Sequence, residues 1–321
     1  MAGVQRVGVR AVVGSSVLQF LKRSRTSLAY LSILIPGLVF AQAQMSTPGS
    51  FAVSSSGAAT YTIPLQVPPG TAGMQPSLAL SYNGQAGNGL AGVGWSLSGS
   101  SSIHRCPRSY VQDGSLGGVN YDANDRLCLD GDRLVLVGGT YGFAGSEYRT
   151  EHESFSKIVM GAANDFEVRS KSGQIMHYRS VAAAPPKTNI ARQWVLDRVT
   201  DRAGNYMTYT YTEDTANGVL APSRIDYTGS PTTATYSAVV FVYGIIRTDV
   251  PPMYEAGAVM NRPRLLTNIQ TFVGANLVKD YQLAYEFYLS PATSRQRLSK
   301  VTVHGRDGSN LDIQLPGPMF T

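Results

Sequence analysis

The chain has 321 residues, of which only 15% are charged, and it is rich in glycine (33), tyrosine (18) and proline (17). This composition suits short strands joined by turns and excludes a mainly helical protein, whose exposed faces need far more lysine, glutamate and arginine. Of the net charge of +6, +5 arises within residues 1–43, and the rest of the chain is nearly neutral, which disfavours nucleic-acid binding through bulk charge.

Residues 1–43 have the pattern of a secretory signal peptide. Basic residues precede an apolar run over residues 28–40, and Ala41-Gln42-Ala43 supplies a small-x-small cleavage site. A membrane anchor is the alternative, but an apolar run of about 13 residues is short for a bilayer span. We therefore expect a protein secreted to the periplasm or the extracellular space, with residues 44–56 as a flexible leader because they are small and serine-rich.

The first strands of the mature chain are predicted at residues 59–67 and 77–82, where polar and apolar residues alternate. Pro64 cannot donate a ladder hydrogen bond, so we expect an edge strand or a bulge there. The two strands are expected to form a hairpin-like pair. Next come Trp95, which we interpret as a packing anchor, and five glycines that bend the strands: Gly84, Gly87, Gly89, Gly92 and Gly94.

Further hairpins are marked by turn residues. Residues 126–129 and 133–137 flank Asp130-Gly131-Asp132, and residues 165–178 turn at Lys171–Gly173. Residues 194–211 contain a strand, a turn and a second strand rich in threonine and tyrosine.

Cys106 and Cys128 are candidates for a disulfide. Export would place them in an oxidising compartment, where such bonds persist. Closing this loop would stabilise the fold by roughly 3 kcal/mol in a chain-entropy estimate. Two separate buried thiols are the alternative, and a zinc site is disfavoured because the nearest histidine, His104, has no ligand-spaced partner.

The residue pattern of the sequence changes after an Ala-Pro loop, so a subdivision of the region 57–321 is expected near residues 182–193. A weak repeat follows, and the segments Arg224–Gly229 and Arg297–Gly305 resemble each other in the second half of the repeat unit. Hairpin units of this kind are expected to stack into an extended sheet. No ten-residue stretch combines a helical period with caps. We expect an all-β fold of mostly antiparallel hairpins that form extended curved sheets, with very little helix.

The segment Gly87–Gly92 matches the G-x-G-x-x-G fingerprint of dinucleotide-binding loops, and Asp113 follows about twenty residues later. That chemistry also needs a helix that begins at the glycines and turns its N-terminal amides toward the pyrophosphate. Here the next residues alternate and are rich in glycine and serine. The pattern therefore favours a glycine-shaped turn in a β protein.

Other catalytic patterns are weak. Glu151-His152-Glu153 is similar to the E-x-E pair of arginine-directed ADP-ribosyltransferases, but no Ser-Thr-Ser strand precedes it, and an exposed strand end is the better interpretation. The four histidines are scattered, and there is no G-x-S-x-G elbow for a nucleophilic serine. Five side chains could together hold calcium, although aspartate-rich hairpin turns are more common: Asp122, Asn124, Asp125, Asp130 and Asp132.

Residues 57–108, continued by residues 117–137, closely resemble the N-terminal region of the SpvB family. The shared elements are G-A-x-Y-x-I-P-L, P-P-G-x-x-G-x-Q-P-x-L-x-L-x-Y and G-x-G-W-x-L. That family groups the Salmonella virulence plasmid B protein with the B components of insecticidal toxin complexes, which are related to Rhs/YD-repeat proteins. The resemblance implies a β-rich shell segment and a toxin or Rhs polypeptide, encoded nearby, as the partner.

The resemblance also implies that the family's ADP-ribosyltransferase domain is absent, because the chain ends at Thr321 before any propeller or effector domain. We therefore assign no catalytic, cofactor-binding or metal-binding residue. The expected function is that of a secreted, toxin-associated structural module that takes part in packaging or delivering a toxin polypeptide. The alternatives are an ADP-ribosyltransferase that uses Glu151 and Glu153, and a surface adhesin or carbohydrate-binding protein, suggested by the 18 tyrosines.

Overall fold

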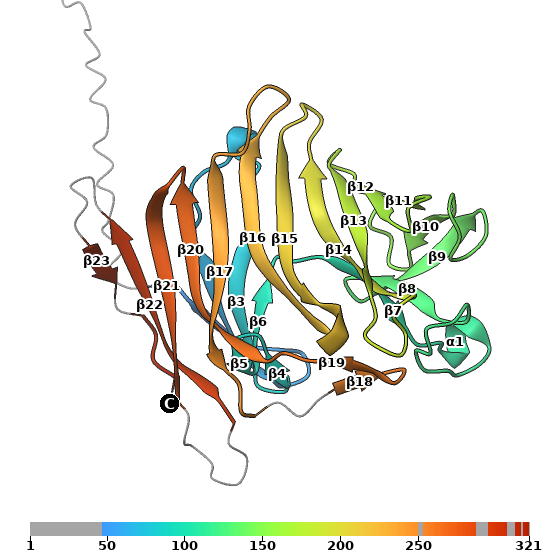
Figure 1. Cartoon of the computed structure of the whole chain (residues 1–321), viewed down its shortest axis with the longest axis horizontal. Coiled ribbons are helices and arrows are strands. Elements are labelled where there is room, and N and C mark those ends of the chain that lie inside the picture. Colours follow the sequence, from blue (N-terminus) through green and yellow to red (C-terminus); the bar gives the residue numbers. More distant parts are fainter. Residues whose placement is uncertain (1–46, 250–252, 287–294, 307–311, 316, 321) are drawn as a thin grey trace, which may run out of the picture. The chain divides into compact units, whose positions relative to one another are not determined.

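A computed structural model describes residues 47–249, 253–286, 295–306, 312–315 and 317–320 (Figure 1). The expected signal peptide, residues 1–43, lies outside the described residues. Nearly all regular structure in the described part is antiparallel β-sheet, which confirms the all-β prediction.

The N-terminal strands form a four-stranded sheet in the order β1-β2-β3-β6. Pro64 lies in β2, which is an internal strand, and this differs from the expected edge position. However, β1 pairs only with residues 59–62 of β2, so the neighbour on that side ends before the proline and no ladder bond is lost. The strands are β1 (Ser50–Val53), β2 (Ala59–Leu65), β3 (Leu78–Asn83) and β6 (Trp95–Ser98).

The next eight strands form a closed sheet. Each strand from β7 to β14 pairs with the one that follows it in the chain, and β14 pairs back with β7 through His104 and Gln193. The strands are β7 (Ser102–Cys106), β8 (Arg126–Leu129), β9 (Asp132–Gly138), β10 (Glu147–Thr150), β11 (Lys157–Met160), β12 (Phe166–Arg169), β13 (Ile175–Ala182) and β14 (Ala191–Thr200).

From β14 the ladder continues into an open sheet of long strands, seen side by side in Figure 1. The strands succeed one another as a meander, except that the small hairpin β18–β19 interrupts the chain between β17 and β20. They are β15 (Tyr206–Asp214), β16 (Val219–Gly229), β17 (Ser237–Ile246), β20 (Arg264–Val273), β21 (Asn276–Glu286), β22 (Arg297–Arg306) and β23 (Asp312–Leu315).

The remaining elements are short, which confirms the prediction of very little helix. They are η1 (Thr71–Gly73), α1 (Tyr110–Asp113), η2 (Thr215–Asn217), the paired strands β4 (Asn88–Gly89) and β5 (Gly92–Val93), and the hairpin of β18 (Met253–Glu255) and β19 (Ala258–Met260).

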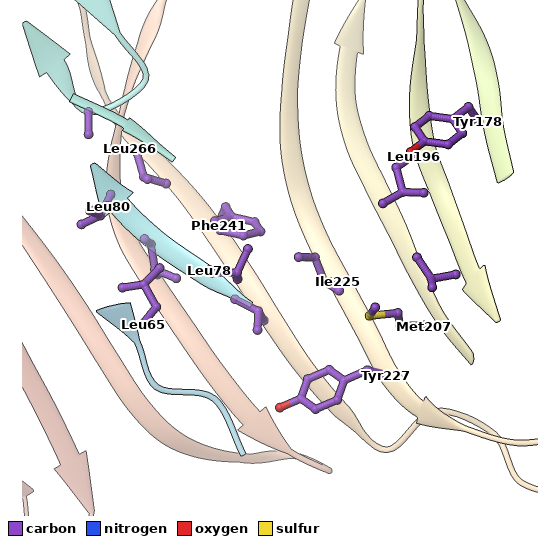
Figure 2. Packing of buried hydrophobic residues seen from close by; sticks show 14 of the residues in the cluster. Leu65, Leu78, Leu80, Tyr178, Leu196, Met207, Ile225, Tyr227, Phe241 and Leu266 are labelled. Carbon is purple, nitrogen blue, oxygen red and sulfur yellow. The ribbon is translucent and has the colours of Figure 1, made fainter. Parts of the chain in front are cut away.

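One main hydrophobic core joins all three sheets. Figure 2 shows Leu78 and Leu80 of the four-stranded sheet beside Phe241 and Leu266 of the open sheet. Burial alternates over the first four residues of β3, with Leu78 and Leu80 buried, because successive side chains of a strand point to opposite faces and these two face the open sheet. Residues just after β2 extend the contact, since the amide of Gln66 donates to the Tyr281 hydroxyl over 2.7 Å.

Two expected boundaries differ from the structure. The segment 44–56 was expected to be a flexible leader, but its residues 50–53 form β1, because pairing with β2 satisfies their backbone groups. The expected subdivision near residues 182–193 falls between β13 and β14, which pair directly over most of their length. The Ala-Pro loop is therefore a connection within the closed sheet and does not separate two parts.

Candidate functional site

The glycine segment, residues 84–94, forms a small hairpin and not a nucleotide loop. β4 and β5 pair through Asn88 and Val93, and the chain then enters strand β6 at Trp95. No helix follows the glycines, so the aligned amides that bind a pyrophosphate are missing from this described segment. Like the sequence pattern, the structure favours a turn over a dinucleotide site.

The backbone of this segment presents carbonyl groups to cations. Arg247 donates from Nη1 to the Gly89 carbonyl over 2.6 Å, and Arg262 donates from Nη1 to the Asn88 carbonyl over 3.0 Å. The Leu266 amide donates to the Leu90 carbonyl over 3.0 Å. A phosphate needs donors, whereas these groups are acceptors, so the loop has the opposite polarity to a phosphate cradle.

A buried ion pair fixes the hairpin to the end of the open sheet. Arg247 Nε and Asp249 Oδ1 lie 3.1 Å apart, and both side chains are fully buried. Asp249 also accepts from the Gln296 amide over 2.9 Å and from Asn88 Nδ2 over 3.4 Å. We call Asn88, Gly89, Arg247, Asp249 and Gln296 the clamp.

The clamp was not predictable from local sequence patterns. Its members come from three separate segments of the chain, and the one local signal is an arginine two residues before an aspartate, directly after β17. Such spacing also occurs in exposed pairs, for example Arg224 and Asp226.

Trp95 occupies a buried position at the start of β6. It is 2% exposed, and its ring centroid lies 5.4 Å from that of Tyr82 and 4.9 Å from that of Phe320. The ring therefore packs between the four-stranded sheet and the last described residues of the chain.

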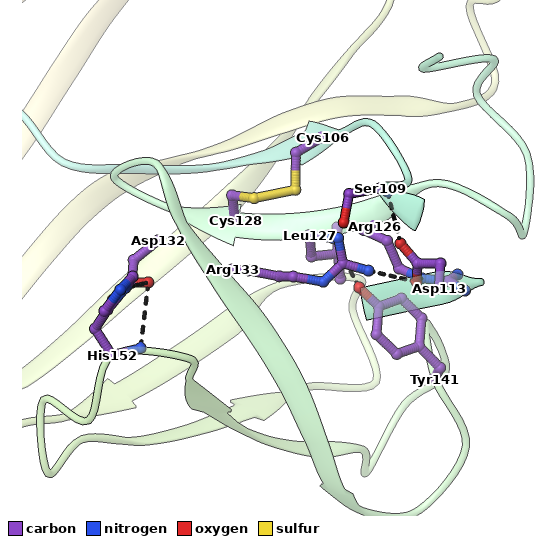
Figure 3. The surroundings of a disulfide bond; sticks show 10 residues. All are labelled: Cys106, Ser109, Asp113, Arg126, Leu127, Cys128, Asp132, Arg133, Tyr141 and His152. Carbon is purple, nitrogen blue, oxygen red and sulfur yellow. Dashed lines mark hydrogen bonds and ion pairs between the residues drawn. A yellow bond between two sulfur atoms is a disulfide. The ribbon is translucent and has the colours of Figure 1, made fainter. Parts of the chain in front are cut away.

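Cys106 and Cys128 form a disulfide between the adjacent strands β7 and β8 (Figure 3). Below it, Asp113 of α1 accepts from Arg126 Nε over 2.7 Å, from Arg133 Nη2 over 2.5 Å and from the Ser109 amide over 2.9 Å. Burial raises the pKa of this carboxyl group, but the hydrogen bonds from Arg126, Ser109 and Arg133 outweigh that effect and lower it to about 2.

The loop of residues 107–125, which joins β7 to β8 and contains α1, exposes apolar side chains, and we call it the braced loop. Tyr110, Val111 and Leu116 are 71%, 90% and 76% exposed, although the loop itself is tied down by the disulfide and by Asp113. An ordered loop that holds large apolar groups in water is typical of a contact surface.

The E-x-E residues lie on an exposed bend after β10. Glu151 accepts from Gln112 Nε2 over 3.1 Å, and Glu153 accepts from the Phe155 amide over 2.5 Å. These bonds are local links between loops, as expected for a strand end.

The five candidate calcium ligands serve separate structural roles. Asp125 pairs with Arg105 over 3.0 Å, Asp130 accepts from Ser101 and from the Ser102 amide, and Asp132 contacts His152. Asp122 and Asn124 form a local turn, in which the Asn124 amide donates to Asp122. No group of three or more acidic, histidine or cysteine side chains suited to a metal occurs within the described residues.

His177 lies between two carboxylates on the outer face of the closed sheet. Its Nδ1 is 2.6 Å from Asp197 Oδ1, and its Nε2 is 2.8 Å from Asp165 Oδ2. Partial burial lowers the pKa of the imidazole, but the hydrogen bonds to Asp197 and Asp165 outweigh it and raise the pKa above its usual value. Because each ring nitrogen faces a carboxylate oxygen, the ring is best satisfied as imidazolium, which donates a hydrogen bond from both nitrogens.

Residues 53–137 match the family model described as SpvB, the Salmonella virulence plasmid 65kDa B protein. Curated relatives are the mono(ADP-ribosyl)transferase SpvB of Salmonella typhimurium, 26% identical over 223 residues, and that of Salmonella choleraesuis, 27% identical over 224. Each match covers 58% of this chain and 36% of the relative. The chain thus spans about a third of the length of these relatives.

Solved structures share the fold. The N-terminal domain of the effector SpvB from Salmonella typhimurium LT2 matches with a TM-score of 0.58 and 20% identity, over 76% of this chain and 99% of that one. TcdB2-TccC3 matches with a TM-score of 0.66 and 19% identity, over 84% of this chain and 16% of that one. The Photorhabdus luminescens Tc holotoxin pore matches with a TM-score of 0.65 and 20% identity, over 86% and 16%.

Within the described ranges, no helix has the length and apolar character needed to cross a membrane. Residues 53–137 are thus similar to the SpvB family model, the chain is similar in sequence to the curated SpvB relatives, and its fold is that of the SpvB N-terminal domain.

Proposed function

We propose that this chain is a secreted, non-catalytic structural module that binds a toxin polypeptide and helps to package or deliver it. The observation that carries the proposal is the match of its fold to 99% of the SpvB N-terminal domain and to one part of the much longer TcdB2-TccC3 chain. The matched solved SpvB structure is that of its N-terminal domain, which fits a role in assembly better than one in chemistry.

The contacts of the candidate catalytic groups support a non-enzymatic role. The glycine segment directs its carbonyls at Arg247 and Arg262, and Glu151 and Glu153 are engaged in loop contacts at the surface. An ADP-ribosyltransferase needs a cleft that excludes water around its acidic pair, and both glutamates are exposed.

The contact surface that we propose for the toxin polypeptide is the braced loop with Tyr110, Val111 and Leu116. A loop that is already ordered loses little backbone entropy when its large apolar side chains are covered, so it suits a protein interface. The disulfide beneath the loop supports a secreted location, since such bonds persist in oxidising compartments.

The carbohydrate-binding alternative loses its main support. It was suggested by the tyrosine content, but many of the tyrosines lie in the core or pack against it, including the fully buried Tyr148, Tyr178 and Tyr227. These rings pack inside the protein and are not available to stack on sugars.

The test is co-expression of the chain with a toxin or Rhs-type polypeptide encoded beside it, followed by size-exclusion chromatography. A stable complex that Val111→Asp weakens at least tenfold supports the proposal. Val137→Asp, at a 55% exposed position on β9, is the matched control and should leave binding unchanged. Absence of any complex with such polypeptides, or NAD hydrolysis that disappears in Glu153→Ala, would contradict it.

A further inference from the structure

A cavity of about 360 Å³ lies at the end of the open sheet, beside the glycine segment. It is lined by residues of β15, β16 and β17, by the connection from β19 to β20, and by Leu90 from the tip of the glycine hairpin. This volume is within the range of about 300–1,000 Å³ that is usual for small-molecule sites.

The polar and apolar groups of the lining are segregated. Leu90, Val219, Leu220 and Phe241 give most of the wall its apolar character. The hydroxyl of Tyr243 donates to the Pro222 carbonyl; apart from Tyr243 and Thr212, the polar side chains of the lining come from one continuous stretch, Asn261–Arg264. The cavity therefore has an apolar body and a single polar rim.

The charge at that rim is positive. Arg262 and Arg264 both line the cavity, no carboxylate lines it, and neither arginine has an ion-pair partner within the described part of the chain. Arg262 donates one hydrogen bond, to the Asn88 carbonyl, and Arg264 has no side-chain hydrogen bond among the described residues. A guanidinium group in this setting favours an anion that accepts from two of its three nitrogens.

Neighbouring charge reinforces this preference. Partial desolvation, followed by the positive charges of Arg247 and Arg192, lowers the pKa of the Arg262 guanidinium group. Arg192 is only 7% exposed, and its Nε has no hydrogen-bond partner in the described structure. Arg247 is paired with Asp249, and the carboxylates of Glu255 and Glu213 act on Arg192, whereas Arg262 has no such partner among the described residues, so a bound anion would compensate the charge of Arg262.

We propose that this cavity binds a medium-chain fatty acid, with its carboxylate between Arg262 and Arg264 and its alkyl chain against Leu90 and Phe241. One charged head and one unbranched apolar tail match one polar rim and an apolar body. A peptide C-terminus also carries a carboxylate, but its amide groups would enter the apolar part of the cavity without partners, which is costly.

The experiment is isothermal titration calorimetry of the purified full chain with decanoate below its micelle concentration. Decanoate should bind at one site, whereas decanol, which has the same tail without the charge, should bind at least about tenfold more weakly. Arg264→Gln should weaken decanoate binding about tenfold, because it removes a charge-assisted bond from a side chain that has no other partner. Leu220→Trp, which fills the cavity from its apolar side, should abolish binding while the protein stays folded by circular dichroism.

Three results would overturn the proposal. They are no heat of binding with decanoate, equal affinities for decanoate and decanol, and full decanoate affinity in both variants. A short peptide with a free C-terminal leucine serves as the competing ligand, and tighter binding of that peptide than of decanoate would also reject the fatty acid as the occupant. None of these results affects the proposed contact with a toxin polypeptide, which is tested at Val111.

Discussion

Gly94 shows why the glycine segment needs glycine at particular positions. Its φ is +76°, and an added Cβ would lie 2.5 Å from Cε2 of Tyr82. The left-handed backbone costs about 1–2 kcal/mol for any residue with a Cβ, and overpacking adds about 1–3 kcal/mol. Gly94→Ala should therefore lower the free energy of unfolding in urea by at least about 2 kcal/mol.

Gly87 is the matched control in the same segment, because an added Cβ there meets no atom within 4 Å. Gly87→Ala should change the free energy of unfolding by less than about 0.5 kcal/mol. Equal losses in the two variants would show that the strain assigned to Gly94 is wrong.

Trp95 is the largest side chain of the family signature that is buried in the core. Trp95→Ala should lower the free energy of unfolding by about 3–5 kcal/mol, since it removes the contacts with Tyr82 and Phe320 and leaves a cavity. Tyr110→Ala, at a 71% exposed position, should cost less than about 0.5 kcal/mol. Thermal melting of both variants checks this, and an unchanged midpoint for Trp95→Ala would reject the role of packing anchor.

His177 should make the stability of the closed sheet depend on pH. Its pKa in the folded chain is raised above the ordinary value of about 6.5, so its contribution is fully present below that pH and is lost as the pH rises through the folded-state pKa. The carboxylates of Asp165 and Asp197 titrate at much lower pH in ordinary surroundings. The difference in melting temperature between the wild type and His177→Gln should shrink from about pH 5.5 to about pH 8.5.

His152 is the control, because it contacts one carboxylate, that of Asp132, and its side chain is 91% exposed. Solvent screens such a pair, so His152→Gln should have a smaller pH-dependent effect. A difference for His177→Gln that grows with pH would contradict the imidazolium assignment.

At the scale of elements, the disulfide fixes the pairing of β7 with β8 around the loop that carries α1. It closes a loop with a sequence separation of 22, so replacing both cysteines by alanine should destabilise the protein by roughly 3 kcal/mol in urea unfolding. A reducing agent should produce a similar loss in the wild type and no change in the double variant. Equal stability of the oxidised wild type and the double variant would contradict this prediction.

Local hairpins were predictable because their signals are local. Asp130-Gly131-Asp132 does join β8 to β9, and the turn at Lys171–Gly173 does join β12 to β13. In each case alternating side chains and turn residues lie within about ten positions of each other, which is the range over which sequence patterns constrain the backbone.

The closure of the eight-stranded sheet was not predictable in the same way. It depends on β7 pairing with β14 through His104 and Gln193, nearly ninety residues apart in the chain. Neither strand carries a feature that selects the other, and burial of one face fixes their register only when the intervening strands are in place. The clamp escaped prediction for the same reason, since its members meet only after the open sheet has formed.

At the scale of the whole described structure, the three sheets share one core, and the clamp links the N-terminal glycine segment to the ends of β17 and β22. Asn88 lies about 160 residues before Asp249 and about 210 residues before Gln296, and Asp249 of the buried ion pair contacts both. Loss of that pair should therefore weaken the attachment of the four-stranded sheet to the open sheet, and its effect should extend beyond a single turn.

Arg247→Met should lower the free energy of unfolding by about 3–5 kcal/mol, because it leaves the Asp249 carboxylate buried without its partner. The double variant Arg247→Met/Asp249→Leu should cost less than the sum of the two single variants, since no lone charge then remains. Arg224 and Asp226 have the same spacing in β16, and their side chains are 46% and 25% exposed, so Arg224→Met should cost no more than about 1 kcal/mol. Additive losses at Arg247 and Asp249 would mean that the pair does not act as a unit, and the glycine segment would then be held by its backbone contacts alone.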